Sequence, residues 1–471
     1  MHWLAIHFPR LALEVLSTAT DEQPRAVDDR HRIHCCNAAA AASGVQPGQS
    51  TAAARAICAR LSVIGRDTSR EQRALEQLAT WAWQYSSQIS PRPPDLLLLE
   101  IARSQKLFGG LRTLIERLRD ALDSLQHQAR HCAAPTPNAA ALLVGAGYQC
   151  NFRDWQAVHR ALAHVPLRQL PIDARRLQIL HDSGLRHVAE LLRLPRDGLS
   201  QRLGKDFLLW LDRLTGQAAD PQPAFTPPAH FRQRLLLPAD ASSTRQLRFA
   251  ARRLLQRLAG YLTGIQGGAM KLRWRLYFND GQEDHFELHL STPERDADKL
   301  FDLMRERLER LRLPAPVREL ALEVDRLEAL AGVPGDLFDS DRDALRDLPT
   351  RLRARLGDDA VWGLELVAEH RPEYASRAVP PGSARPAPSR HFPRRPVWLL
   401  PRAQSLQVRD GQPWLNGPLT LEADRERLES GWWDSRPMRR DYYVARDRDC
   451  RRLWIYHDLR DSGWYLHGVF D

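Results

Sequence analysis

The hydrophobic and polar positions of the chain change their period several times, and each change predicts a different kind of structure. Between residues 1 and 165, short apolar runs such as Trp3–Ile6 and Leu96–Ile101 alternate with segments of helical period such as Arg70–Gln84 and Leu111–Leu125. Short apolar runs separated by amphipathic helices indicate an α/β region built on a sheet.

Residues 171–216 keep a helical period throughout, and their short connections contain Gly184 and Pro195–Gly198. The next stretch, 217–230, is polar and rich in proline, which is typical of a linker. The sequence therefore predicts a helical domain that an extended connection ties to the region after it.

Residues 231–328 read as strand, helix, strand, strand, helix, strand. Asn279–Gly281 carries the Asp-Gly signal of a hairpin turn, and the last strand, "VRELALEV", alternates apolar and polar positions. This βαββαβ order predicts a compact sheet with two helices on one face.

The C-terminal part of the chain changes character twice more. Residues 371–396 are rich in proline, so we expect them to be disordered or extended. The last 75 residues hold six of the thirteen tryptophans, in short strand-like segments such as "RRLWIYHD" and "GWYLHGVF". We interpret them as a small β-rich module in which most tryptophans are core.

Composition narrows the class of protein without deciding it. A length of 471 residues suggests three to five structural units, and 43% hydrophobic with 27% charged residues is typical of a globular protein. No apolar run is long enough to span a membrane, and the N-terminus does not resemble a leader, so a cytoplasmic protein is expected. The six cysteines form no CxxC pair. The net charge of +10 points weakly to a polyanionic partner.

Several stretches of the first 330 residues resemble the Y-family translesion DNA polymerases: "LAIHFPRLALEVL", "GVQPGQSTAAARAICARL", "LLLLEIARSQKLFGG" and "APTPNAAALL". The C-terminal "GWWDSRPMRRDYYVARDRDCRRLWIYHDLRDSGWYLHGVF" resembles the tail of the ImuB-type branch, the mutasome subunits, which active Y-family enzymes do not share. The resemblance implies a multidomain α/β and α+β fold of right-hand architecture. Its expected parts are a palm (1–20 and 75–165), a fingers insertion (21–74), a helical thumb (166–218), a βαββαβ little finger (229–330), a tether (331–396) and a β-rich module (397–471).

The same resemblance locates the metal site. Active family members place an aspartate at the end of the first strand and a second ligand two residues later, positions that correspond to His7 and Pro9. Their second acidic pair corresponds to Asp95 and Leu96, so one carboxylate is kept and one is lost. Glu100 corresponds to a downstream aspartate that is usually structural. Mg²⁺ prefers carboxylate oxygens, and imidazole is a poor substitute.

The residues that hold the nucleotide in the family are also replaced. A tyrosine and an arginine that bind the triphosphate correspond to Ala38 and Ala41, and a lysine near the end of the palm corresponds to Ala139. Each preorganised electrostatic contact can contribute ~2.7–4 kcal/mol to transition-state stabilisation, so losing several predicts a pseudo-polymerase without metal or cofactor. The alternative is a weak metal-dependent DNA polymerase that uses His7, Asp95 and Glu100 with an ion such as Mn²⁺.

The predicted little finger is polarised in charge along its sequence. Residues 229–278 hold ten Lys and Arg against one Asp, whereas 279–330 hold eight Lys and Arg against fourteen Asp and Glu. Strand alternation puts five cations on one sheet face, and the resemblance implies that this face binds DNA without regard to sequence. These residues are Arg232, Arg234, Lys271, Arg273 and Arg275. The alternative is a solvated face whose arginines reflect codon usage.

Two shorter features add candidate binding sites. "LHDSGLRHVAELLRLP" resembles a helix–hairpin–helix, in which Gly184 would let the backbone approach a phosphate, although a plain helix C-cap explains the glycine equally well. "GVPGDLFDSD" (332–341) partly resembles a sliding-clamp motif through Asp336, Leu337 and Phe338, and the alternative is a hydrophobic turn packed on the little finger.

The predicted function is therefore a non-catalytic, DNA-binding adaptor for damage-induced (SOS-type) translesion synthesis and mutagenesis. It would bind primer–template DNA and the sliding clamp. The resemblance also implies an error-prone replicative-type polymerase α subunit and an ImuA-type RecA-like protein as partners. A third possibility is a damaged-DNA-binding protein that has neither a clamp nor a polymerase partner.

Overall fold

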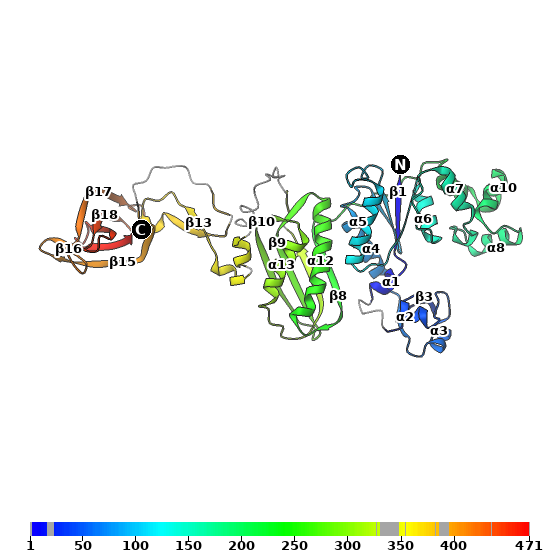
Figure 1. Ribbon diagram of the computed structural model, residues 1–471, viewed down its shortest axis with the longest axis horizontal. Helices are drawn as coiled ribbons and strands as arrows, with labels where there is room; N and C mark the ends of the chain where they lie inside the picture. Colours follow the sequence, from blue (N-terminus) through cyan, green and yellow to red (C-terminus); the bar gives the residue numbers. More distant parts are fainter. Residues whose placement is uncertain are drawn as a thin grey trace. The chain divides into compact units, whose positions relative to one another are not determined.

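The computed structural model describes residues 2–16, 23–325, 327–329, 348–353, 355–381, 383–385, 395–434 and 436–470. Contacts divide the chain into two units, Met1–Arg355 and Leu356–Asp471. Figure 1 follows the elements of both along the chain.

The palm of the first unit is a four-stranded antiparallel sheet of order β5-β6-β1-β7. Alternate residues of β1 enter two different cores: Leu4 and Ile6 pack with helices α4 and α5, and Trp3 and Ala5 pack with α6. The helices accordingly lie on both sides of β1 (Figure 1). Its elements are β1 (Trp3–His7), α1 (Leu11–Glu14), α4 (Thr68–Ala82), β5 (Ile89–Arg92), β6 (Leu96–Glu100), α5 (Leu111–Ser124), β7 (Arg130–Ala134) and α6 (Pro137–Gly145).

The fingers are a small insertion between α1 and α4. Their three strands form a sheet of order β3-β2-β4, and two short alanine-rich helices pack on it around a core of their own. Arg66 links this insertion to the palm helix through a paired contact with the buried Glu71. The elements are β2 (Arg25–Asp29), β3 (Arg32–Cys36), α2 (Ala38–Ala42), α3 (Thr51–Ile57) and β4 (Ser62–Gly65).

The thumb is helical, as its period predicts, and its core is continuous with that of α6 in the palm. Its elements are α7 (Trp155–Ala163), the short 3₁₀ helix η1 (Leu167–Gln169), α8 (Ala174–Asp182), α9 (Val188–Leu192), α10 (Arg196–Leu203) and α11 (Lys205–Thr215). The proline-rich stretch after α11 is extended but attached to the palm. The Phe225 N–H donates to the carbonyl of Ile89 at 2.8 Å, and Arg92 donates to Gln222 at 2.8 Å.

The little finger has the predicted βαββαβ order, followed by one short extra strand. Its antiparallel sheet runs β10-β9-β11-β8, with β12 beside β9, and both helices belong to the core on one sheet face. Burial of alternate residues of β9, among them Leu272, Trp274 and Leu276, explains this layering. The elements are β8 (Phe231–Ala241), α12 (Thr244–Gly264), β9 (Gly267–Phe278), β10 (Glu283–Glu294), α13 (Ala297–Leu308), β11 (Val317–Val324) and β12 (Leu327–Ala329).

The second unit is rich in β-structure, as predicted, but begins well before residue 397. Its six-stranded antiparallel sheet runs β16-β15-β20-β19-β18-β17, and a separate hairpin pairs β13 with β14. The strands are β13 (Gly363–Leu366), β14 (Ser376–Val379), β15 (Trp398–Arg409), β16 (Gln412–Trp414), β17 (Thr420–Ser430), β18 (Met438–Arg446), β19 (Arg452–Asp458) and β20 (Trp464–Val469). Two single-turn 3₁₀ helices, η2 (Asp358–Ala360) and η3 (Pro372–Tyr374), also belong to this unit.

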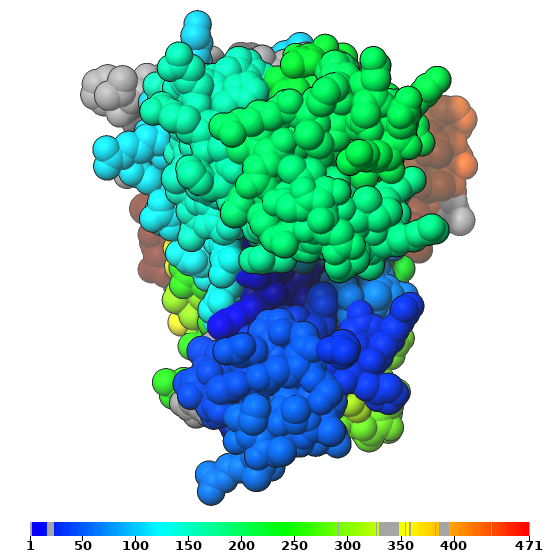
Figure 2. Space-filling model, turned by 90° about the vertical axis from the view of Figure 1, so that its right-hand side faces the viewer, coloured from blue at the N-terminus to red at the C-terminus, as the bar shows by residue number. Residues whose placement is uncertain are grey.

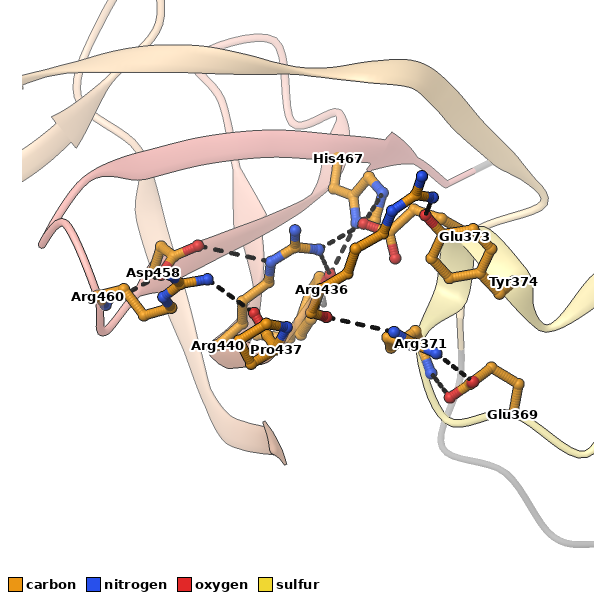
Figure 3. A network of polar contacts seen from close by, with 11 residues as sticks. Glu369, Arg371, Glu373, Tyr374, Arg436, Pro437, Arg440, Asp458, Arg460 and His467 are labelled. Atoms are coloured by element: carbon orange, nitrogen blue, oxygen red, sulfur yellow. Dashed lines mark hydrogen bonds and ion pairs between the residues drawn. The ribbon is translucent and has the colours of Figure 1, made fainter. Parts of the chain in front are cut away.

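Part of the predicted proline-rich tether is held by ion pairs to this sheet. The buried Arg371 contacts Asp434 at 2.8 Å, and Glu373 contacts Arg440 at 2.5 Å. Figure 3 shows Arg371, Glu373 and Arg440 gathered with His467 between the tether segment and the sheet. Of the two predicted alternatives, disordered or extended, the extended one holds for β14 (Ser376–Val379), and ion pairs within the second unit hold the residues just before it.

Candidate functional site

The first strand ends where the polymerase-type metal site was predicted. His7 lies opposite Leu96 in the pairing of β1 with β6, and its Nε2 atom is 3.4 Å from Oδ2 of Asp95. Both side chains are partly exposed. The structure therefore brings two of the predicted residues together at one end of the palm sheet.

The other predicted positions at this sheet end add no carboxylate. Leu96 packs against the core shared by palm and thumb, and Pro9 lies in the turn after β1, separated from the strand by Phe8. No group of three or more His, Cys, Asp or Glu side chains within the described part of the chain has an arrangement that could hold a metal ion. Asp95 is thus the single carboxylate among the four positions that correspond to the family's metal site.

Glu100 does not belong to this sheet end. It lies opposite Trp3, at the far end of β6 from Leu96, which places it about 13 Å along the strand from His7. Its side chain is buried and accepts a hydrogen bond from the Ala102 N–H at 3.1 Å. The idea that Glu100 acts with His7 and Asp95 is therefore wrong.

The three alanines at the former nucleotide-binding positions lie in two places. Ala38 and Ala41 are exposed on α2 of the fingers, and Ala139 is fully buried in α6. Beside Ala139, Asn138 accepts a hydrogen bond from Arg92 at 3.0 Å. Burial lowers the pKa of Arg92, with the nearby charge of Asp220 opposing the shift. Arg92 is the one guanidinium that contacts this stretch of α6 among the described residues.

Figure 2 shows the face on which thumb and fingers approach each other. The dark-blue N-terminal segment is visible at a waist between the fingers below and the turquoise and green thumb above. The waist is where a substrate would reach the palm sheet in a right-hand architecture.

The predicted DNA-binding face of the little finger carries five carboxylates that contact its five predicted cations: Glu283, Glu287, Glu319, Glu323 and Asp325. Along the strand order β10-β9-β11-β8, the sign of charge alternates from strand to strand, because Glu287 and Glu323 flank Arg273 in register. Each of the five predicted cations is paired. The contacts are Lys271–Glu287 at 2.7 Å, Arg273–Glu287 at 3.0 Å, Arg275–Glu323 at 3.2 Å, Arg232–Glu323 at 2.9 Å, and Arg234–Glu319.

Two carboxylates hold this network together. Burial alone would raise the pKa of Glu287, but hydrogen bonds from Lys271 and Arg273, together with their charges, lower that pKa to about 2. Glu323 is only 6% exposed and contacts three arginines, Arg232, Arg273 and Arg275. We call these five cations with Glu287, Glu319 and Glu323 the sheet-face network. The predicted open basic face is in fact close to electrically neutral.

Gly184, in the thumb hairpin that follows α8, takes part in the C-cap of that helix. Gly184 has φ +80°, its N–H donates to His181, and the Leu185 N–H donates to Leu180, which is the double bond of a Schellman motif. The next two backbone N–H groups, of Arg186 and His187, both donate to Glu190. Each N–H that could meet a phosphate therefore has a partner within the hairpin.

The remaining predicted features divide between described and undescribed residues. Asp336, Leu337 and Phe338 lie outside the described residues. Trp454 is buried and Trp464 half-buried, whereas Trp432 and Trp433 are exposed and touch each other edge to face. The prediction that most of these tryptophans are core holds for the pair in β19 and β20 only.

One interface was not predicted. Helix α12 of the little finger packs on α4 of the palm, where Gly260 and Gly264 leave room for Trp81 and Trp83. Beside them the buried Arg257 donates hydrogen bonds to Gln77 and His127 of the palm. Glycines four apart on a helix are a recognisable signal of close helix approach, but they do not say which helix approaches.

The helix and strand order of the first unit defines a palm, fingers, thumb and little finger. Residues 12–144 match the model of the impB/mucB/samB family. Nearly the whole chain is similar to Protein ImuB of Caulobacter vibrioides, in strains NA1000 / CB15N and ATCC 19089 / CIP 103742 / CB 15. The identity to each is 27% over 460 residues, which is 91% of this chain and 100% of the relative. These matches confirm the predicted resemblance to a Y-family polymerase-like protein of the ImuB type.

Solved structures are similar at a more distant level. A crystal structure of DinB from Sulfolobus solfataricus is 16% identical with a TM-score of 0.40, covering 70% of this chain and 100% of that chain. An insertion ternary complex of Dbh DNA polymerase is 15% identical with the same TM-score and coverage. None of the described helices is both long and apolar enough to cross a membrane.

Proposed function

We propose that this protein is a non-catalytic, Y-family-type adaptor that binds primer–template DNA and brings a separate, error-prone polymerase to damaged sites. The observation that carries the proposal is the end of β1, where His7 and Leu96 stand at carboxylate positions and Asp95 alone remains. Two-metal phosphoryl transfer needs oxygen ligands that bridge both ions and fix an in-line geometry. One carboxylate beside an imidazole offers too few hard ligands for that arrangement.

The nucleotide side supports the same conclusion. Ala38, Ala41 and Ala139 offer no hydrogen bond or charge to a triphosphate, whose charge is normally met by arginine, lysine and hydroxyl groups. Arg92 does not replace them readily, because its guanidinium is already bonded to Asn138 and Gln222. We therefore expect both weak nucleotide binding and no nucleotidyl transfer.

DNA binding by the sheet-face network requires an exchange of partners. The side chain of Arg232 is 72% exposed and that of Arg234 is 51% exposed, so phosphates can reach both. Exposed ion pairs contribute only about 0–1 kcal/mol each, which a phosphate backbone can outweigh. When the arginines turn to phosphates, their carboxylates lose their cationic partners, which reduces the net gain in binding free energy. We therefore expect a moderate affinity for DNA.

The partners belong to the proposal as well. Similarity to Protein ImuB covers 91% of the chain and so extends into the C-terminal unit. That unit exposes Trp432 and Trp433 as an aromatic pair of the kind enriched in protein interfaces. We assign contact with the ImuA-type protein and the polymerase α subunit to the C-terminal unit, and sliding-clamp contact to residues 332–341. The proposed localisation is cytoplasmic.

The deciding experiment is single-nucleotide incorporation on a primer–template, in Mg²⁺ and separately in Mn²⁺, with DNA affinity measured in the same samples. Binding without incorporation in either metal is the expected result. Incorporation that disappears in Asp95→Ala would overturn the proposal and favour the weak polymerase, with His7 as a working ligand. Deleting residues 332–341 should abolish clamp binding and leave DNA binding intact. A damaged-DNA-binding protein without partners would show no clamp binding to begin with.

A triple substitution of Lys271, Arg273 and Arg275 by glutamine tests the DNA-binding face. It should weaken binding and flatten its salt dependence. The matched control is Arg245, Arg248 and Arg252 changed together to glutamine, because these cations lie on α12 rather than on the sheet. Equal affinity and equal salt slope in wild type and sheet variant would exclude the sheet face.

A further inference from the structure

A second basic site lies between the palm and the little finger. A cavity of about 340 Å³ opens between α1 and α4 of the palm and β8 and α12 of the little finger. This volume falls at the lower end of the range for small-ligand sites. Its lining contains five arginines, one histidine and two glutamates: Arg70, Arg73, Arg234, Arg253, Arg257, His127, Glu14 and Glu319.

The two glutamates are too few to neutralise the five arginines. Glu319 is paired with Arg234, and Glu14 accepts hydrogen bonds from His127 at 2.7 Å and from the Gln128 N–H at 3.0 Å. On the rim, Arg70 contacts Asp67 at 3.3 Å, and Nε of Arg73 donates to the Ser69 carbonyl. The cavity therefore keeps an excess of positive charge.

The excess is concentrated in two buried arginines one helical turn apart on α12. Arg253 is 5% exposed and Arg257 is 6% exposed. Within the described residues neither guanidinium has a carboxylate at ion-pair distance. Arg257 bonds instead to Gln77, Gln233 and the Nε2 atom of His127. Arg253 has a contact of 3.5 Å to Gln126, and its buried Nε has no hydrogen-bond partner among the described groups.

Leaving two neighbouring cations buried without a carboxylate is costly. Burial, followed by the charge of the neighbouring Arg253, lowers the pKa of Arg257 to about 9. Burial likewise lowers the pKa of Arg253. Packing alone does not require a charged side chain at these two buried positions. The chemistry of the cavity therefore favours an anionic ligand as the partner of Arg253 and Arg257.

We infer that this cavity binds a phosphate group, held by Arg253 and Arg257 from the little finger and by Arg73 from the palm. Guanidinium groups suit phosphate because their planar donors form paired hydrogen bonds with its oxygens. The phosphate would belong either to a small oligophosphate or to a DNA backbone. In both cases it bridges palm and little finger, so binding stabilises their docked arrangement. The inference does not depend on the proposed adaptor role.

Thermal unfolding of the full chain in inorganic triphosphate tests the inference, with sodium chloride at equal ionic strength as reference. Wild type should gain a few degrees in Tm when triphosphate exceeds its Kd about 100-fold. Arg253→Gln should lose at least ten-fold in triphosphate affinity while its Tm without triphosphate stays equal or rises. Arg73→Gln, on the exposed rim, should also lose affinity without affecting folding. Arg252→Gln is the matched control, because Arg252 is the neighbouring residue, is 54% exposed and pairs with Asp298.

Two results of these measurements would overturn the inference. Equal triphosphate stabilisation of wild type, Arg253→Gln and Arg252→Gln would overturn the inference, as would no stabilisation of wild type beyond that in chloride. DNA affinity then identifies the source of the phosphate. If the backbone occupies the cavity, triphosphate competes with duplex DNA and Arg253→Gln weakens DNA binding relative to Arg252→Gln. If the ligand is a small oligophosphate, both variants bind DNA alike.

Discussion

Replacing Gly260 with alanine should loosen the little finger from the palm. Gly260 lies within α12 where a Cβ atom would be 2.6 Å from Cδ1 of Trp81 and 3.1 Å from the Trp81 carbonyl oxygen. The indole is 2% exposed and the carbonyl belongs to α4, so neither can move away easily. Overpacking of this kind costs roughly 1–3 kcal/mol. The alanine gains roughly 0.5–1 kcal/mol in helix propensity, so a net destabilisation of about 1–2 kcal/mol is expected.

Gly198→Ala is the matched control. Gly198 is also inside a helix, α10, but a Cβ there would meet no atom within 4 Å. The same substitution should therefore stabilise the protein by roughly 0.5–1 kcal/mol. Urea unfolding gives both free energies, and hydrogen exchange should show faster opening of α4 and α12 in Gly260→Ala only. If Gly260→Ala stabilised the protein as much as Gly198→Ala, the close packing of α12 on α4 would be refuted.

Two further predictions concern charge. Burial lowers the pKa of His127 below 6.5, with the hydrogen bond to Glu14 opposing and the charges of Arg257 and Arg253 adding to the shift. Near pH 6, His127 therefore binds a proton in the unfolded chain more readily than in the folded protein. Stability should therefore fall from pH 7 towards pH 5.5. His127 contributes at most about 1.4 kcal/mol per pH unit to this fall, and His127→Gln should remove that contribution in urea unfolding, whereas the contributions of His2 and His131, whose pKa burial also lowers, should remain. Glu287→Gln should remove the carboxylate that Lys271 and Arg273 share. DNA affinity, measured by fluorescence anisotropy, should then rise several-fold with a steeper salt slope. Unchanged binding would show that these two cations do not contact DNA.

Much of the fold could be predicted because period and turn signals act locally. The apolar run at Trp3–Ile6 and the alternation in "MKLRWRLYF" predicted β1 and β9, and the Asp-Gly turn predicted the β9–β10 hairpin. The contacts of residues 371–374 could not be predicted, for the opposite reason. Their proline content predicts a disordered or extended segment, but Arg371 and Glu373 pair with Asp434 and Arg440 far along the chain, and no local signal reports such contacts.

The site was predicted in part, for related reasons. The resemblance placed His7 and Asp95 together, and the structure agrees. Strand alternation correctly placed Lys271, Arg273 and Arg275 on one face, but the charge of that face depends on which strands flank β9. Strand order is a tertiary property, so the neutralising role of Glu287 and Glu323 could not be read from β9 alone.

The distribution of charge between the two basic regions of the first unit bears on how DNA would be held. Neutralising five phosphates with an open five-cation face would give a salt slope near −4.5, since each phosphate contact contributes about −0.9. The sheet-face network has carboxylates for every one of its cations, and the thumb hairpin has already used its backbone donors. Uncompensated positive charge lies instead in the cavity beside α12, at Arg253 and Arg257. An anion bound in this cavity would therefore act on the docking of the little finger to the palm as well as on affinity.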